Sequence, residues 1–235
     1  MDALVEGYRR FRAEAWPRER ARFEALAAGQ KPGAMVVTCA DSRVDPQMIF
    51  AAAPGQLFVV RNVAALVPPY APDAAYHGTS AALEFGVRVL RVPDLVVLGH
   101  GQCGGVHALL RGAPEEAADF VAPWMGIAGA ARRRALACDT PEAQQEAGEL
   151  EVVRLSLANL MTFPWIAEAV GAGRLRLHGA HFAIYTGLLR RLEPGGEFAP
   201  VAEAAPAGVA TGRCFQPGRS RASLAATKQA GSNRP

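Results

Sequence analysis

The chain has 235 residues, half of them apolar and a fifth charged, which is typical of a globular protein with one large domain. Its formal net charge is +3, but residues 201–235 hold five basic residues against one acidic residue, Glu203. The other 200 residues therefore carry a net charge of −1, which argues against a nucleic-acid-binding surface. No apolar stretch reaches the roughly 18 residues of a transmembrane helix, so we expect no membrane partner.

The amino terminus predicts a helical arm over residues 1–32. Leu4, Tyr8 and Phe11 recur at helical spacing among charged residues, and Pro17 is expected to divide the segment. The segment is charged throughout and has no apolar core like that of a secretory signal. We therefore expect a reducing, cytoplasmic setting, in which thiols stay available to a metal.

Residues 33–200 alternate between apolar, β-branched runs and helical patterns. The runs predict buried strands, and the longer segments between them predict helices. Strands are expected at 34–38, 57–60 and 95–98 and from Leu175, with a hairpin near Thr186-Gly187, and helices at 46–53, 75–91, 104–110, 115–135 and 140–170. This order predicts an α/β domain with a mainly parallel sheet flanked by helices. Residues 201–235, rich in Ala, Gly, Pro, Ser and Arg, are expected to form a poorly ordered basic tail.

Cysteine and histidine follow two of these predicted strands. Cys39 begins the segment Cys-Ala-Asp-Ser-Arg, and His100 begins His-Gly-Gln-Cys-Gly-Gly, which contains Cys103. The carboxyl ends of parallel strands lie at one edge of a sheet, so the two segments can meet. Each residue alone would more simply be a core residue, but two thiolates, an imidazole and the Asp41 carboxylate together suit tetrahedral Zn²⁺. The sequence therefore predicts one zinc ion per chain.

Asp41 and Arg43 predict a way to open this site for catalysis. A guanidinium can hold a carboxylate through two parallel hydrogen bonds. If Arg43 holds Asp41, only Cys39, His100 and Cys103 bind zinc, and the fourth position is free for water. Asp41 could then orient that water. If Arg43 releases Asp41, the carboxylate becomes the fourth metal ligand, and the sequence leaves both states open.

The residues near these motifs predict a small apolar substrate pocket. Val63, Ala64 and Gly105 could form its walls, although each could equally be a core residue. Gly104 and Gly105 begin a predicted helix and could offer backbone N–H groups to an oxyanion. Such a pocket suits attack on a small neutral electrophile such as CO₂.

The chain resembles the β-class carbonic anhydrases. The resemblance spans about residues 1–192 and rests on four segments, Cys39–Val44, Arg61–Ala64, His100–Gly105 and Leu177–Gly179. It implies reversible hydration of CO₂ to bicarbonate and a proton, with zinc on Cys39, His100 and Cys103 and with Asp41 either on zinc or paired with Arg43. It also implies a homodimer or tetramer whose amino-terminal helices pack on the neighbouring subunit, and a place for Gln47 beside the substrate.

Two alternatives stay open at this point. A zinc hydrolase for COS or CS₂ would need the same ligands and would differ in the lining of its pocket. A non-catalytic zinc or bicarbonate-binding module would not need the pairing of Asp41 with Arg43. For Arg61 we expect a structural or interface role.

Overall fold

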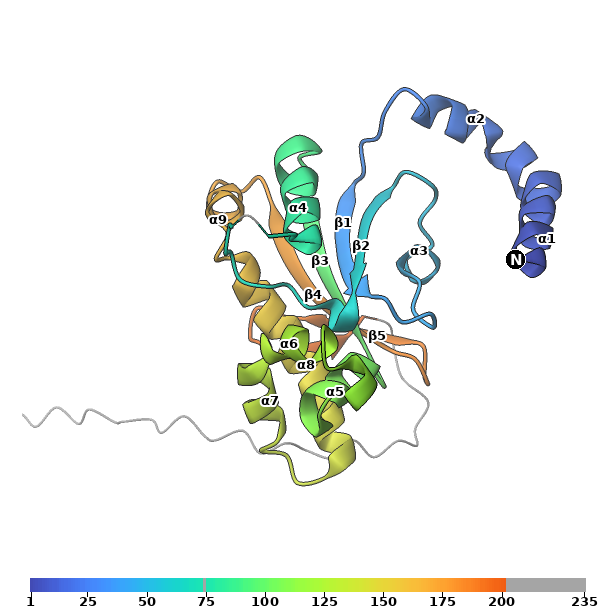
Figure 1. The fold of residues 1–235 in the computed structure, drawn as a ribbon. Helices are drawn as coiled ribbons and strands as arrows, with labels where there is room; N and C mark the ends of the chain where they lie inside the picture. Colours follow the sequence, from blue (N-terminus) through green and yellow to red (C-terminus); the bar gives the residue numbers. More distant parts are fainter. Residues whose placement is uncertain (74, 202–235) are drawn as a thin grey trace, which may run out of the picture.

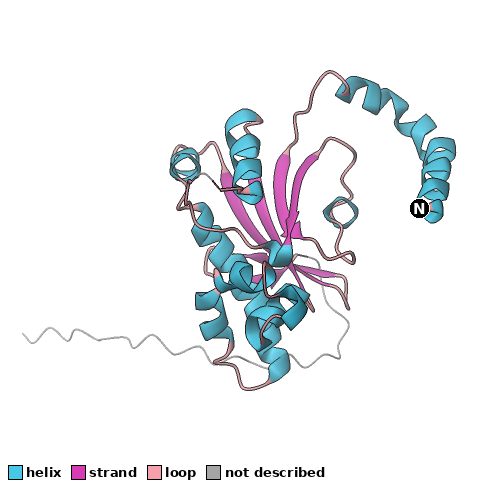
Figure 2. Cartoon of the chain, in the orientation of Figure 1, coloured by secondary structure: helices cyan, strands magenta, loops and turns pink. Residues whose placement is uncertain are grey.

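The computed structural model describes residues 1–73 and 75–201, so the predicted tail lies outside the described residues from position 202 onwards. A six-stranded sheet in the order β2-β1-β3-β4-β5-β6 forms the centre of the body (Figures 1 and 2). Its strands are β1 Ala34–Cys39, β2 Leu57–Asn62, β3 Asp94–His100, β4 Arg176–Ala183, β5 Leu188–Leu192 and β6 Phe198–Pro200. The first four run parallel, and β5 and β6 pair antiparallel to their neighbours. The predicted α/β class with a mainly parallel sheet is confirmed.

Helices flank this sheet and also form an amino-terminal arm. Their bounds are α1 Asp2–Arg10, α2 Trp16–Leu26, α3 Pro46–Ile49, α4 Gly78–Glu84, α5 Gly104–Arg111, α6 Val121–Gly126, α7 Gly129–Ala135, α8 Pro141–Leu160 and α9 Pro164–Gly171. Short 3-10 turns occupy Val63–Ala65 and Glu115–Ala117. Among the described residues, no helix is both long and apolar enough to cross a membrane.

The amino-terminal arm stands away from the body, as the dark blue helices of Figure 1 show. Its two helices contain no buried residue, and Leu4 and Tyr8 are 72% and 60% exposed. Pro17 divides the arm as predicted, because it lies in the first turn of α2, directly after the break between the two helices. The turn before it widens into a π-helix over Phe11–Ala15. This wider turn lets the chain stay helical although proline has no N–H to donate.

The main core lies between one face of the sheet and helices α4, α8 and α9. Met35 and Val37 of β1 and Leu95 and Val97 of β3 alternate onto this face, as expected for strand geometry. The helices and the turns beside them pack against these strands with Leu83, Val87, Val153, Leu160, Phe163 and Ile166. The buried position of β1 and β3 fixes the two loops that carry the metal motifs.

Several predicted elements have different lengths in the structure. The helix predicted at 46–53 ends at Ile49, because Ala51 adopts a left-handed conformation with φ 47°. Asp45 does cap this helix, since its carboxylate accepts the N–H groups of Gln47 and Met48. The strand predicted from Leu175 continues to Ala183, and the predicted hairpin then leads into β5.

Asp94 ties the amino ends of β3 and β4 together and should make stability depend on pH. Arg176 donates two hydrogen bonds of 2.7 Å to its carboxylate, and His178 Nε2 lies 2.7 Å away. Chiefly through Arg176, these contacts lower the pKa of Asp94 to about 2, while burial opposes them. This lowered pKa adds stability above about pH 4, which is lost as the pH falls towards 2.

We expect Asp94→Asn to lower the free energy of unfolding by about 1 kcal/mol at pH 7, a figure reduced for screening because Arg176 is 68% exposed. Urea denaturation of both proteins at pH 7 and near pH 2.5 would measure this difference. It should shrink at the lower pH, and an equal difference at both values would contradict the assignment.

Candidate metal centre

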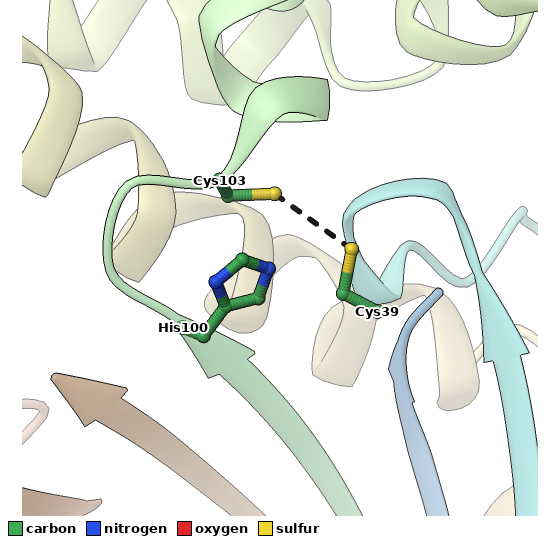
Figure 3. Close-up of side chains that lie close together, drawn as sticks. All are labelled: Cys39, His100 and Cys103. Carbon is green, nitrogen blue, oxygen red and sulfur yellow. Dashed lines mark hydrogen bonds between the residues drawn. The ribbon is translucent and has the colours of Figure 1, made fainter. Parts of the chain in front are cut away.

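Cys39, His100 and Cys103 meet at the carboxyl edge of the parallel sheet. Cys39 ends β1, His100 ends β3, and Cys103 lies just before α5, so that their side chains point towards one another (Figure 3). The two sulfurs are 3.9 Å apart, and one ligand atom from each residue lies within 4.8 Å of the others. All three residues are at least 94% buried. The predicted strand ends therefore bring these three donors together.

The geometry of these donors fits a tetrahedral zinc ion. Two sulfurs that are each about 2.3 Å from a tetrahedral zinc should be about 3.8 Å apart, close to the separation seen here. His100 Nδ1 lies 2.8 Å from the Gly101 carbonyl oxygen, which leaves Nε2 as the nitrogen that faces the cysteines. Nε2 is buried and has no hydrogen-bond partner. A bound metal would satisfy it, since a buried polar atom without a partner is costly.

The two thiols influence each other's protonation without a metal. The hydrogen bond with Cys103 lowers the pKa of Cys39 despite its burial. The same contact, together with burial, raises the pKa of Cys103. The two pKa values move in opposite directions for one reason. The sulfurs lie so close that they share one proton when only one of them is a thiolate. A cation between them would stabilise both thiolates.

Asp41 is held by Arg43 and turned aside from the three donors. Arg43 Nε and one terminal nitrogen donate to the two carboxylate oxygens at 2.9 and 2.7 Å, and the Arg43 backbone N–H adds a third bond. The guanidinium also donates to the Gln102 carbonyl oxygen, on the loop between His100 and Cys103. Arg43 holds the pKa of Asp41 well below its usual range. Asp41 Oδ2 nevertheless stays 3.8 Å from His100 Nε2, so a small movement would bring it to the metal position.

Arg61 fixes the loop that presents Cys39 and Asp41. It donates hydrogen bonds to three backbone carbonyl oxygens, those of Cys39, Asp41 and Val44. Because a guanidinium is donor-only and planar, it can hold several carbonyl groups of one loop at once. This contact agrees with the structural role expected for Arg61.

The segment after β2 approaches the metal centre through an unusual backbone. Ala64 and Ala65 both adopt left-handed conformations, with φ of 68° and 54°. Asn62 supports the turn by accepting the Leu66 N–H and donating to the Leu66 carbonyl oxygen. A Cβ atom on Gly105 would lie 2.7 Å from Val63 Cγ1 and 3.0 Å from Ala64 Cβ. The start of α5 therefore rests directly on the Val63–Ala64 segment.

The predicted substrate residues do not all lie in one place. Cys39, Cys103 and Ala64 belong to one buried cluster, against which Val63 packs. Gly104 and Gly105 begin α5 beside them. Gln47 is exposed on α3, so its proposed contact with substrate stays a prediction. A surface cavity of about 720 Å³ is lined by Val63, Tyr76, Phe120 and Trp124 but by none of the three metal donors.

Sequence reasoning missed four residues that support this centre. Trp124 donates to the Val63 carbonyl oxygen at 2.9 Å, and Asn62 supports the neighbouring turn. Glu149 accepts the Cys103 N–H and is paired with His181. A single-sequence signal exists for Glu149, which is an acidic residue between Gly148 and Val152 on the buried face of α8. His181 could not be recognised, because its partner lies 32 residues away in sequence.

Comparisons with known proteins agree with this geometry. A family model described as carbonic anhydrase matches residues 34–189. A carbonic anhydrase from Pseudomonas aeruginosa is 38% identical over 198 residues, covering 82% of this chain and 88% of the relative. A carbonic anhydrase from Synechococcus elongatus is 34% identical over 191 residues, covering 80% of this chain and 70% of the relative.

Solved structures give the same result for the fold. The β-carbonic anhydrase CcaA is similar with a TM-score of 0.80 and 33% identity, covering 85% of this chain and 98% of that one. One of two tetrameric β-carbonic anhydrases from Sordaria macrospora has a TM-score of 0.72 at 26% identity, covering 81% of this chain and 95% of that one. Because the family model spans more than half of the sequence and close relatives cover most of it, this chain belongs to the β-carbonic anhydrase family of lyases.

Proposed function

We propose that this chain catalyses the reversible hydration of CO₂ to bicarbonate and a proton, with one Zn²⁺ held by Cys39, His100 and Cys103. The observation that carries the proposal is the pairing of Asp41 with Arg43, which leaves three donors around a position that a fourth ligand could occupy. Three protein ligands and one open position are typical of catalytic zinc sites. When bound, zinc would supply a Lewis acid that makes water a nucleophile near neutral pH.

The chain's own residues have distinct roles in this proposal. Arg43 holds the Asp41 carboxylate in place, and Asp41 accepts a hydrogen bond from the water that enters the open position. The buried surroundings of Ala64 and the nearby Val63 keep bulk water away from a small apolar substrate. The N–H groups of Gly104 and Gly105 are candidates to stabilise negative charge on the product.

A homo-oligomer fits the exposed arm of this chain. An arm without buried residues and with exposed apolar side chains would be stabilised by packing on another subunit. The Sordaria relatives are described as tetrameric, which supports a dimer or a tetramer of this chain. Sedimentation equilibrium would distinguish these states. The cytoplasmic setting and the lack of a nucleic-acid partner stay predictions from the sequence.

Stopped-flow measurement of CO₂ hydration, together with metal analysis of the same sample, tests the proposed function. We expect about one zinc per chain, loss of turnover after chelation and recovery after zinc is restored. A parallel assay with CS₂ and COS examines the alternative substrates, for which we expect much slower turnover. A zinc-loaded protein that does not accelerate CO₂ hydration would contradict the proposal.

A further inference from the structure

A buried polar network lies behind Cys103, on the side of α8. Glu149 of α8 is 4% exposed, and His181 of β4 is 1% exposed. His181 Nε2 lies 3.1 Å from one Glu149 oxygen, while the other oxygen accepts the Cys103 backbone N–H at 3.2 Å. Burying charged and polar groups to this degree is costly unless their hydrogen bonds are satisfied. The network therefore calls for a role beyond packing.

Both peptide groups of Cys103 are held by this helix. Gln145, one turn before Glu149, donates to the Cys103 carbonyl oxygen at 3.1 Å and to Glu149 at 2.8 Å. Residues four apart lie on one face of a helix, so α8 presents an acceptor and a donor to the same residue. The N–H and the C=O of Cys103 are thus fixed by side chains that are 46 and 42 residues away in sequence.

Arg190 of β5 orients this network from its outer end. Its guanidinium lies 3.2 Å from His181 Nδ1 and donates to Glu146 at 2.7 Å. Because a guanidinium has only donors, Nδ1 must be the acceptor. The His181 proton is therefore on Nε2, where it points at Glu149. The two hydrogen bonds of His181 then run in one direction, from Arg190 through His181 to the Glu149 carboxylate.

We propose that Glu149, oriented by His181 and Arg190, is a positioning residue that sets the backbone of Cys103 and so the place of its sulfur in the metal centre. This inference rests on the proposed zinc site. Outer partners of metal ligands often control metal affinity by fixing the orientation of the ligand. In a histidine ligand, the outer partner holds the second ring nitrogen. A cysteine thiolate has no such atom, so here the group that is held is the backbone peptide of the ligand.

Glu149→Gln tests this assignment with little change in shape. The amide keeps one acceptor oxygen and replaces the other with a donor NH₂. That donor faces either the Cys103 and Gln145 N–H groups or the His181 N–H, and Arg190 prevents His181 from moving its proton. We expect zinc affinity, measured by competition with a chromophoric chelator, to fall about 10- to 100-fold. The cobalt-substituted variant should also show altered thiolate-to-cobalt absorption bands.

Glu151→Gln is the matched control, because it removes another carboxylate from the same helix. The Glu151 carboxylate pairs with Arg134 and Arg154 and not with the network at Cys103. It should bind zinc like the wild type. Adding Arg190→Gln to Glu149→Gln should restore most of the lost affinity. The new amide at position 190 can accept as well as donate, which lets His181 move its proton to Nδ1 and accept from the amide at position 149.

Three results would overturn the proposal. They are wild-type zinc affinity in Glu149→Gln, an equal loss in Glu151→Gln, or no restoration by Arg190→Gln. If Glu149→Gln does not fold without metal, as judged by circular dichroism, Gln145→Met removes the donor to the Cys103 carbonyl with a smaller perturbation. It should lower zinc affinity several-fold, and an unchanged affinity would also overturn the proposal. A wild-type chain that binds no zinc would instead mean that the proposed function itself fails.

Discussion

Arg43→Ala should abolish CO₂ hydration while most of the zinc stays bound. The guanidinium makes two hydrogen bonds to the Asp41 carboxylate, which lies only 3.8 Å from His100 Nε2. Without Arg43, the carboxylate is free to become the fourth metal ligand and to exclude water from that position. Loss of one oriented electrostatic partner typically costs about 100- to 1,000-fold in turnover, and we expect at least that loss here.

Stopped-flow turnover and zinc content, measured on the same preparation, check this prediction. Arg111→Ala is a suitable control, because Arg111 is exposed at the end of α5 and its guanidinium contacts Gln144. It should keep both turnover and zinc. Arg43→Lys keeps the charge but loses the two parallel hydrogen bonds, so its turnover should stay low. Normal hydration by Arg43→Ala would show that the pairing with Asp41 does not control access to the metal.

Cys103→Ser should lose most of its zinc. Serine is close to cysteine in size, but its hydroxyl stays protonated near neutral pH and is a poor ligand for a borderline-soft ion. The variant also leaves Cys39 without the sulfur that lies 3.9 Å away. The loss of affinity should exceed the roughly 10- to 100-fold that follows the loss of an outer partner. Zinc analysis after dialysis, with circular dichroism to confirm folding, would measure it.

His107→Ala provides the comparison for this second variant. His107 lies four residues after Cys103 on α5, but its side chain is exposed. Its removal should leave the zinc content unchanged. Full zinc occupancy in Cys103→Ser would contradict the ligand assignment.

The elements that carry the proposed metal ligands could be predicted because their signals are local. The runs Ala34–Thr38 and Leu95–Leu98 are apolar and β-branched, and a short run of this kind indicates a buried strand. Parallel pairing then places Cys39 and His100 at the same edge. The spacing of His100 and Cys103 is short enough to allow one metal to reach both. The three donors of the proposed zinc site followed from these facts.

The remaining contacts depend on packing between segments that are distant in sequence. The position of His181 depends on the full length of β4, and the sequence indicated only its first part. The contact of Glu149 with Cys103 depends on how α8 packs against β3 and β4. The left-handed turns at Ala51 and Ala64 occur at alanine, which gives no local sign of positive φ. These features need the assembled fold, and so they were not predicted.

The close contact of Gly105 with Val63 and Ala64 has a consequence for redesign. A methyl group at position 105 would meet atoms at 2.7 and 3.0 Å, so it would displace either the first turn of α5 or the left-handed segment beside it. A shift of the first turn of α5 would move Cys103, two residues earlier in the chain, and a shift of the other segment would move Ala64, which packs with Cys39 and Cys103. An attempt to adapt the proposed substrate pocket to bulkier molecules should therefore shorten the side chain of Val63 and leave position 105 without a side chain.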